Sequence, residues 1–232
     1  MTLKDDLKSD VSAVFRSVWT ERNGTVVPST ADIKLANDGV NLAATVLYAD
    51  LSDSTKMVDK REPKFSAEIY KTFLLCSAKI IKHFGGTITA YDGDRIMAVY
   101  VGNRKNTDAV KSGLKINGAV KKVIMPALKT QYPDTDYVLR HVVGIDTSDL
   151  LVARTGVRGD NDLVWVGRAA NWAAKLCSLD HNYPTRITKA VYDVMMDEVK
   201  FGGDPKRNMW EARTWTDMKN ASIYRSNWWW GV

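Results

Sequence analysis

Apolar side chains recur every three or four residues in four stretches of the chain, a spacing typical of amphipathic helices. We expect these helices at residues 3–19, 63–84, 107–132 and 168–179. Gly85 and Gly86 follow the second stretch and Pro133 follows the third, and such residues commonly end helices. The pattern therefore predicts several helices, two of them long.

Shorter apolar runs between these helices predict strands. We expect strands within residues 41–50, 87–100, 137–146, 150–154, 163–166 and 221–230, with a further strand–helix passage that includes residues 190–199. The run at 87–100 contains Asp92-Gly93, a strong turn signal for a β-hairpin. Because strands and helices alternate with one hairpin, we expect an α/β (α+β) fold in which helices flank a mixed sheet.

A polar segment that includes Gly24, Pro28 and Ser29 follows the first helix. We therefore expect two parts: an N-terminal helical appendage with its linker at residues 1–30, and a main domain at residues 31–232. Of the 232 residues, 45% are hydrophobic, enough for one sizeable core. Thr2 and Asp5 can cap the appendage helix.

A net charge of +6 and a pI near 9.2 fit a polyanionic ligand, either a nucleotide or a nucleic acid. Much of the excess lies in one predicted helix, whose lysines match a solvated face. These are Lys111, Lys115, Lys121, Lys122 and Lys129. No aromatic-rich recognition motif accompanies them, so we expect no nucleic-acid partner.

Cellular location is constrained by three negative features. No apolar stretch approaches the length needed to span a bilayer, and the first residues are too charged for a signal peptide. Two cysteines, Cys76 and Cys177, cannot by themselves form a disulfide framework or a zinc site. We therefore expect a reduced, cytoplasmic protein without a membrane partner.

Two acidic residues border predicted strands, where a carboxylate is otherwise a poor choice. Asp50 closes the apolar run 41–50, and Asp94 follows the hairpin turn. Two carboxylates at adjacent strand ends form an oxygen-ligand site for a pair of divalent cations, which suits in-line chemistry at a phosphate. The plainer interpretation is that strands often end in Asp and that Asp-Gly is a common turn.

Four motifs in this order resemble the catalytic domain of the class III nucleotidyl cyclases, the fold of adenylate and guanylate cyclases. The stretches are Tyr48-Ala-Asp-Leu-Ser-Asp-Ser-Thr55, Gly85-Gly-Thr-Ile-Thr-Ala-Tyr-Asp-Gly-Asp-Arg-Ile-Met-Ala98, Val143-Gly-Ile-Asp-Thr147 and Gly167-Arg-Ala-Ala-Asn-Trp-Ala-Ala-Lys175. They span most of residues 41–180. The resemblance implies a ferredoxin-like mixed sheet flanked by helices.

The resemblance also implies a reaction, in which the 3′-hydroxyl of a nucleoside triphosphate attacks its own α-phosphate and pyrophosphate leaves. Asp50 and Asp94, with the backbone carbonyl of Leu51, would hold two Mn²⁺ or Mg²⁺ ions. The residues implied for the triphosphate are Ser52, Asp53, Ser54, Thr55 and Arg140. Asn171 would hold the ribose, and Lys175 would face the charge that develops at the α-phosphate.

In the resembling family, the metal carboxylates come from one subunit and the residues matching Asn171 and Lys175 come from the other. We therefore expect a homodimer with shared active sites. A surface polar residue on an alanine-rich helix is the alternative interpretation of Asn171.

Several positions depart from the family pattern. Asp53 and Ser54 replace a glycine and an aromatic residue, and Lys175 replaces an arginine, which removes a planar two-point donor. Val142 stands where the family carries a phosphate-binding arginine, and Arg140, two residues earlier on the same strand face, is the substitute. The C-terminal basic residue that meets the triphosphate is left open among Lys206, Arg207 and Lys219.

The positions that recognise the base differ most from the family pattern. Ala90 and Val164 occupy the two positions that read a purine in the adenylate and guanylate enzymes, and neither can form a side-chain hydrogen bond. Tyr48 could narrow the base pocket or be an ordinary core aromatic.

These losses resemble the bacterial Pycsar pyrimidine cyclases, which make cyclic UMP or cyclic CMP in anti-phage defence and activate a separately encoded effector. The substrate we expect is UTP. CTP is the alternative, and a purine cyclase or a catalytically degenerate nucleotide-binding regulator are further alternatives.

Overall fold

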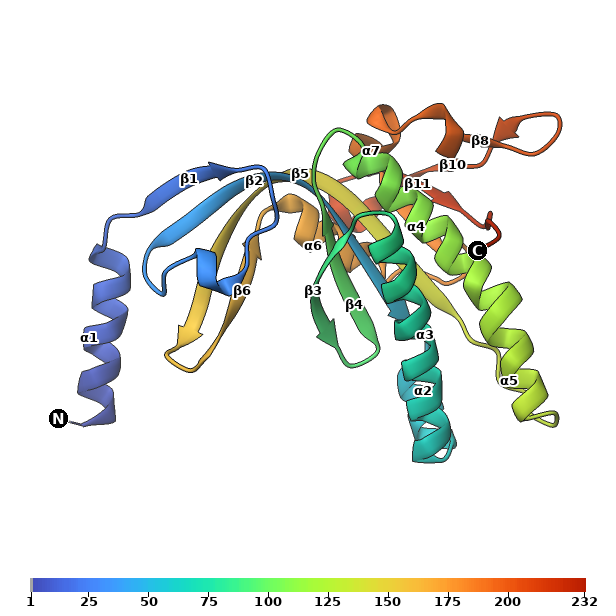
Figure 1. Cartoon of the computed structure of the whole chain (residues 1–232), viewed down its shortest axis with the longest axis horizontal. Coiled ribbons are helices and arrows are strands. Elements are labelled where there is room, and N and C mark those ends of the chain that lie inside the picture. Colours follow the sequence, from blue (N-terminus) through green and yellow to red (C-terminus); the bar gives the residue numbers. More distant parts are fainter. Residues whose placement is uncertain (1) are drawn as a thin grey trace.

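The computed structural model describes residues 2–232, which form an arch around a curved sheet (Figure 1). The helices are α1 (Leu3–Arg16), α2 (Ser54–Lys60), α3 (Pro63–His83), α4 (Lys105–Ala119), α5 (Met125–Gln131), α6 (Arg168–Leu176) and α7 (Lys189–Val194). The short helical segments are η1 (Thr30–Asp32), η2 (Val120–Ile124, a π-helical turn), η3 (Asp197–Val199) and η4 (Thr216–Met218). Among residues 2–232 no helix has the length and apolar character needed to cross a membrane.

The strands are β1 (Thr20–Gly24), β2 (Asp38–Leu51), β3 (Thr87–Asp92), β4 (Arg95–Tyr100), β5 (His141–Val157), β6 (Asp160–Val166), β7 (Thr185–Thr188), β8 (Phe201–Gly202), β9 (Arg207–Asn208), β10 (Glu211–Trp215) and β11 (Ala221–Ser226). The main sheet runs β10-β11-β7-β5-β2-β4-β3, with β1 beside β2 and β6 beside β5. Most neighbouring strands are antiparallel, but β5 pairs with β7 and β1 with β2 in parallel. This mixed sheet flanked by helices confirms the predicted fold class.

Alternating residues of β2 separate the two hydrophobic layers. Leu47 and Ala49 are buried on the face that packs against Phe73 of α3 and Leu114 of α4. Val46, on the opposite face, packs in a cluster with alanines of α6. Helix α6 lies close to the sheet, because a Cβ at Gly144 would come within 2.2 Å of the Ala173 carbonyl oxygen. Glycine at position 144 therefore sets how near α6 approaches the strands.

Several predicted elements have different extents in the structure. The helices expected at 3–19 and 168–179 end at Arg16 and Leu176, and the strand expected at 221–230 ends at Ser226. The strands expected at 137–146 and 150–154 are one strand, β5, because residues 147–149 also pair with β2. The helix expected at 107–132 is α4 and α5 joined by the π-helical turn. Pro126 lies at the start of α5 and has no amide proton to continue a regular helix, which explains the wider turn before it.

The N-terminal segment differs from the prediction in one respect. The linker proposed between the helix expected at 3–19 and residue 30 contains strand β1, which pairs with residues 38–42 of β2 and so joins the main sheet. Polar residues dominate β1, so it carries no apolar alternation that would reveal a strand. Strand β10, also missed, has a similarly exposed sequence. The long helix at 63–83 and the hairpin at 87–100 are confirmed.

Candidate active site

Asp50 lies at the end of β2, directly opposite Arg95 on β4. Its side chain is 14% exposed, and one of its oxygens, Oδ2, accepts hydrogen bonds from Arg95 Nε at 3.1 Å and Nη2 at 2.6 Å. Burial raises the pKa of the Asp50 carboxyl; Arg95 opposes this rise, and the nearby Asp94 carboxylate adds to it. Arg95 therefore neutralises Asp50 in the chain alone, a contact that the sequence did not reveal.

Asp94 follows Gly93 in the turn between β3 and β4, where the glycine has a φ of 59°. Its Oδ2 is buried and, within residues 2–232, has no hydrogen-bond partner. A buried unpaired carboxylate oxygen is costly, and a bound cation is one way to satisfy it. The donor set thus fits divalent ions. Residues 2–232 contain no cluster of three or more His, Cys, Asp or Glu side chains suited to a metal, so backbone, nucleotide or water oxygens would complete the coordination.

The segment after Asp50 turns into α2. The Ser52 amide donates to the Arg140 carbonyl at 2.8 Å, so this amide is already paired. Asp53 is left-handed, with φ 60°, and makes no side-chain cap on α2; this leaves the first-turn amides, including those of Ser54 and Thr55, without a side-chain acceptor. The backbone of this segment therefore offers donors at Ser54 and Thr55 rather than at Ser52.

The Asp53 carboxylate contacts two basic groups. Lys56 Nζ lies 2.6 Å from it and His181 Nδ1 lies 3.7 Å from it. The hydrogen bond from Lys56 holds the pKa of Asp53 below its usual range. The negative charge of Asp53, which alone would repel a triphosphate, is therefore balanced within the chain.

Two tyrosines that the sequence analysis missed lie near the carboxylates. Burial, with Asp94 close by, raises the pKa of Tyr70 on α3. Burial also raises the pKa of Tyr137 to about 12, with smaller contributions from Tyr70 and Asp94. The charge of Arg140 lowers the pKa of both Asp53 and Tyr137. Arg140 is exposed just before β5, whereas Val142 is fully buried. Arg140, unlike Val142, is therefore an exposed basic residue close to Asp53 and Tyr137.

Tyr48 on β2 and Ala90 on β3 lie on either side of Met97 of β4. Both are partly buried and pack in the same hydrophobic cluster, beside Met97. The Arg95 guanidinium carbon lies 5.9 Å from the centre of the Tyr48 ring. Tyr48 therefore lies between a hydrophobic layer and the Asp50–Arg95 pair. It packs as a core aromatic and also lies beside the candidate site.

Val164 does not pack in the hydrophobic cluster that contains Tyr48 and Ala90. It lies on β6 opposite Ala153, its side chain is 39% exposed, and it lines a groove with Val14 and Trp19 near the N-terminal helix. Its neighbours Leu163 and Trp165 point to the other face of the strand and pack in the cluster of Tyr48 and Ala90. Because strand residues alternate between faces, Val164 lies on the face of β6 opposite to the one that packs in the cluster of Tyr48 and Ala90.

Asn171 and Lys175 are one helical turn apart on α6, and both are exposed. The opposite side of this helix presents Ala169 and Ala173 to the sheet. Lys175 Nζ approaches Met218 Sδ at 3.7 Å. Within one chain, these two side chains therefore face away from the sheet that carries Asp50.

Polar anchors that the sequence did not indicate hold α6 in place. Asp146 is fully buried and accepts from Arg168 Nε at 3.0 Å and from the Thr188 hydroxyl. At the other end of the helix, the Cys177 sulfur lies 3.4 Å from the backbone carbonyl oxygens of both Tyr48 and Val142, and its single proton is shared between these two acceptors. Burial raises the pKa of Cys177 to about 12, so the thiol stays neutral.

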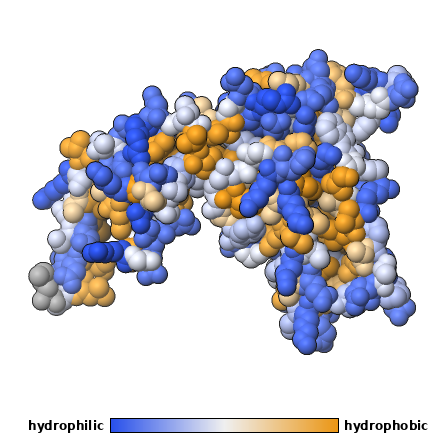
Figure 2. Space-filling model, in the orientation of Figure 1, coloured by the Kyte–Doolittle hydropathy of each residue, from blue (hydrophilic) through white to orange (hydrophobic). Residues whose placement is uncertain are grey.

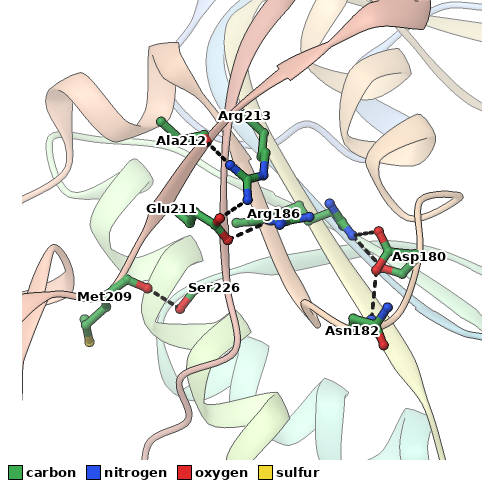
Figure 3. A network of polar contacts seen from close by, with 9 residues as sticks. Asp180, Asn182, Arg186, Met209, Glu211, Ala212, Arg213 and Ser226 are labelled. Atoms are coloured by element: carbon green, nitrogen blue, oxygen red, sulfur yellow. Dashed lines mark hydrogen bonds and ion pairs between the residues drawn. The ribbon is translucent and has the colours of Figure 1, made fainter.

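A second polar network fixes the loop that follows α6 (Figure 3). Arg186 on β7, almost fully buried, donates to the backbone and side chain of Asp180 at 2.6 Å each. Glu211 on β10 pairs with Arg213 on the same strand (Figure 3). The contacts of Arg186 tie the loop to β7, which lies between β11 and β5 in the sheet.

The three basic residues considered for the C-terminal triphosphate contact, Lys206, Arg207 and Lys219, lie in different places. Lys219 directly follows Met218, the residue beside Lys175, and has a left-handed φ of 55° in the turn between β10 and β11. Arg207 instead lies over the Trp228 ring, with its guanidinium carbon 5.2 Å from the ring centre. Lys206 is in the turn between β8 and β9, a separate two-stranded sheet.

Comparison with known proteins adds sequence and structural relatives. The chain is 53% identical to a uridylate cyclase of Burkholderia cepacia over 234 residues and 49% identical to a uridylate cyclase of Xanthomonas perforans over 233 residues, each match covering 100% of both chains. Its fold resembles that of the adenylyl cyclase CyaB from P. aeruginosa, with a TM-score of 0.68 and 21% identity over 80% of this chain and 94% of that one.

The chain matches no model of a protein family. The two relatives are about half identical to this chain over their full length, and this identity, with the cyclase fold, is sufficient to assign the family. The chain is therefore a nucleotide cyclase that belongs to the family of bacterial uridylate cyclases and has the class III fold.

Proposed function

We propose that this cyclase converts UTP to 3′,5′-cyclic UMP and pyrophosphate. The observation that carries the proposal is the full-length likeness to proteins named uridylate cyclase. Ala90 supports it, because its methyl group offers no hydrogen bond at a position that reads a purine in the adenylate and guanylate enzymes, and Tyr48 packs against the same hydrophobic cluster. CTP remains the second candidate, since no residue described above distinguishes the 4-position of the ring.

Asp50 and Asp94 would hold two Mn²⁺ or Mg²⁺ ions, together with the Leu51 carbonyl. Such ions lower the pKa of the attacking 3′-hydroxyl and neutralise the triphosphate. The unpaired Asp94 oxygen supports this assignment. Arg95 donates both of its hydrogen bonds to Asp50 Oδ2, so it would compete with an ion for that oxygen.

The triphosphate would lie against the turn after Asp50. The free first-turn amides of Ser54 and Thr55 and the exposed Arg140 supply donors there, and the salt bridge to Lys56 keeps Asp53 from repelling the phosphates. On the other side, Lys175 would stabilise the charge that develops at the α-phosphate. We assign the C-terminal triphosphate contact to Lys219, because its turn lies beside Lys175.

A homodimer would complete these sites. Asn171 and Lys175 project into solvent on the side of α6 that faces away from the sheet, so a second copy must bring them to Asp50 and Asp94. In this arrangement Asn171 orients the ribose and Lys175 meets the α-phosphate of a nucleotide whose metal ligands belong to the partner. A degenerate regulator would not need this set of groups.

We propose further that cyclic UMP acts as a second messenger in bacterial anti-phage defence and activates a separately encoded effector in the cytoplasm. Residues 31–232 would form the catalytic domain, and residues 1–30 an appendage whose strand β1 is attached to it. The likeness to the uridylate cyclases and the Pycsar resemblance of the site support this role.

Incubation of the purified protein with Mn²⁺ and each of UTP, CTP, ATP and GTP tests the proposal, with the products resolved by mass. We expect cyclic UMP to form fastest and the Asp94→Ala variant to form none. Faster conversion of CTP would overturn the choice of UTP alone. Faster conversion of ATP or GTP would reject pyrimidine selectivity.

A further inference from the structure

Helix α1 buries none of its residues against the rest of the chain. Its apolar stripe is instead open to solvent: Leu3 is 74% exposed, Leu7 54%, Val11 53%, Val14 59% and Phe15 85%. Figure 2 shows hydrophobic surface along this helix at the edge of the molecule. A contiguous exposed apolar face of this kind marks an interaction site in soluble proteins.

Hydrogen bonds nevertheless fix both ends of α1. Thr2 and Asp5 form a capping box at its start. At its end, the Asn37 amide donates to the carbonyls of Val14 and Ser17, at 2.8 Å each. A helix of 14 residues with no buried face is marginal in water, so these anchors hold it in position for a contact outside the chain.

The charges beside the stripe indicate what that contact is. With about 100° of rotation per residue, Lys8 lies about 80° from the centre of the stripe on one edge and Asp10 about 80° on the other. Lys4 lies on the lysine edge and Asp6 on the aspartate edge. None of these four forms an ion pair with any residue among 2–232. The stripe thus has one basic and one acidic edge, both without partners.

We propose that α1 pairs with α1 of a second copy of this chain, in parallel and in register around a two-fold axis. In a parallel pair the lysine edge of each helix faces the aspartate edge of its partner, whereas an antiparallel pair would place like charges together. The two apolar stripes cover each other between these edges. The inference concerns the contact between copies and does not depend on which nucleotide is cyclised.

Disulfide trapping in the full-length protein tests the pairing directly. In a Cys76→Ser background, Leu7→Cys and Val14→Cys are made separately, with Ser9→Cys on the opposite face of the helix as the matched control. Mild oxidation should link two copies of the Leu7→Cys protein, and likewise two copies of the Val14→Cys protein, while Ser9→Cys stays unlinked. Links that form only when the Leu7→Cys and Val14→Cys proteins are mixed would overturn the parallel register, and no links would overturn the pairing.

Sedimentation of charge variants provides a second, independent measurement. Lys8→Glu should raise the dissociation constant of the dimer several-fold, because both edges become acidic, and adding Asp10→Lys should restore it. Leu7→Asp with Val14→Asp should raise this constant about tenfold or more, whereas Ser9→Asp should leave it unchanged. Equal dissociation constants for all these proteins would reject the proposal even if UTP is converted normally.

Discussion

Replacing Arg95 should both destabilise the metal-free protein and strengthen its binding of divalent cations. Arg95 donates two hydrogen bonds to one Asp50 oxygen, at 3.1 and 2.6 Å, and the Asp50 side chain is only 14% exposed. Arg95→Met keeps most of the apolar stem but leaves that carboxylate beside Asp94 without a partner. Both effects follow from one contact, so they are measured together.

The magnitude follows from the exposure of the pair. Hydrogen bonds to charged groups contribute about 1.5–3 kcal/mol, and the Arg95 side chain is 32% exposed, so we expect a loss of about 2 kcal/mol in the free energy of unfolding. For a chain of this length the melting temperature should fall by about 4–8 °C without metal. Because Arg95 no longer competes for Asp50, the affinity for Mn²⁺ should rise about thirtyfold.

Thermal unfolding gives the first quantity, and titration of free Mn²⁺ by electron paramagnetic resonance gives the second. Arg95→Lys is the matched control, since it keeps the charge but supplies a single donor group, and it should fall between wild type and Arg95→Met. Asp50→Asn should lose the tight Mn²⁺ site in either background. Unchanged or weaker Mn²⁺ binding by Arg95→Met would refute competition for Asp50.

Three further changes test other parts of the account. Asp94→Asn should lower turnover roughly a thousandfold while leaving the melting temperature unchanged or higher, because it removes a buried charge without a partner; near-normal turnover under saturating Mn²⁺ would contradict its role as a ligand. Lys175→Arg should raise kcat, since a guanidinium offers two-point contact with the phosphate, and a lower kcat would show that the site is shaped for lysine. Burial lowers the pKa of His141 to about 3, below its ordinary 6.5, so the unfolded chain takes up this proton first as the pH falls. The free energy of unfolding should therefore drop by about 2 kcal/mol from this group between pH 7 and pH 5, and His141→Leu should lack that part of the drop in denaturant titrations; equal losses in both proteins would contradict the buried neutral histidine.

The parts of the fold with clear periodicity were predictable. The stripe of α3 and the Asp-Gly turn of the β3–β4 hairpin follow directly from the sequence. Strand β1 was not predictable from the sequence, because its residues are exposed and its partner in β2 lies 18 positions later in the chain. The continuity of β5 through Thr147 depends on pairing with β2, which is a tertiary contact that no local pattern records.

The candidate site shows the same division. Asp50, Asp94 and Lys175 were indicated by their motifs, and the structure puts the two carboxylates near each other. The contacts of Arg95 with Asp50 and of Asp53 with Lys56 depend on side-chain placement across strands and turns. The sequence did not show that Val164 and its neighbour Trp165 lie on opposite faces of β6, because this depends on the register of the strand in the sheet.

The completion of each site by two copies of the chain is the central claim, and mixing two inactive variants tests it most directly. Asp50→Ala and Lys175→Ala are purified separately, mixed, allowed to exchange subunits, and assayed for cyclic UMP from UTP. If Asp50 and Lys175 of different copies meet, half of the dimers are mixed and each has one intact site, so about a quarter of wild-type activity should return. If the mixture exchanges subunits and still makes no cyclic UMP, the shared-site account is wrong.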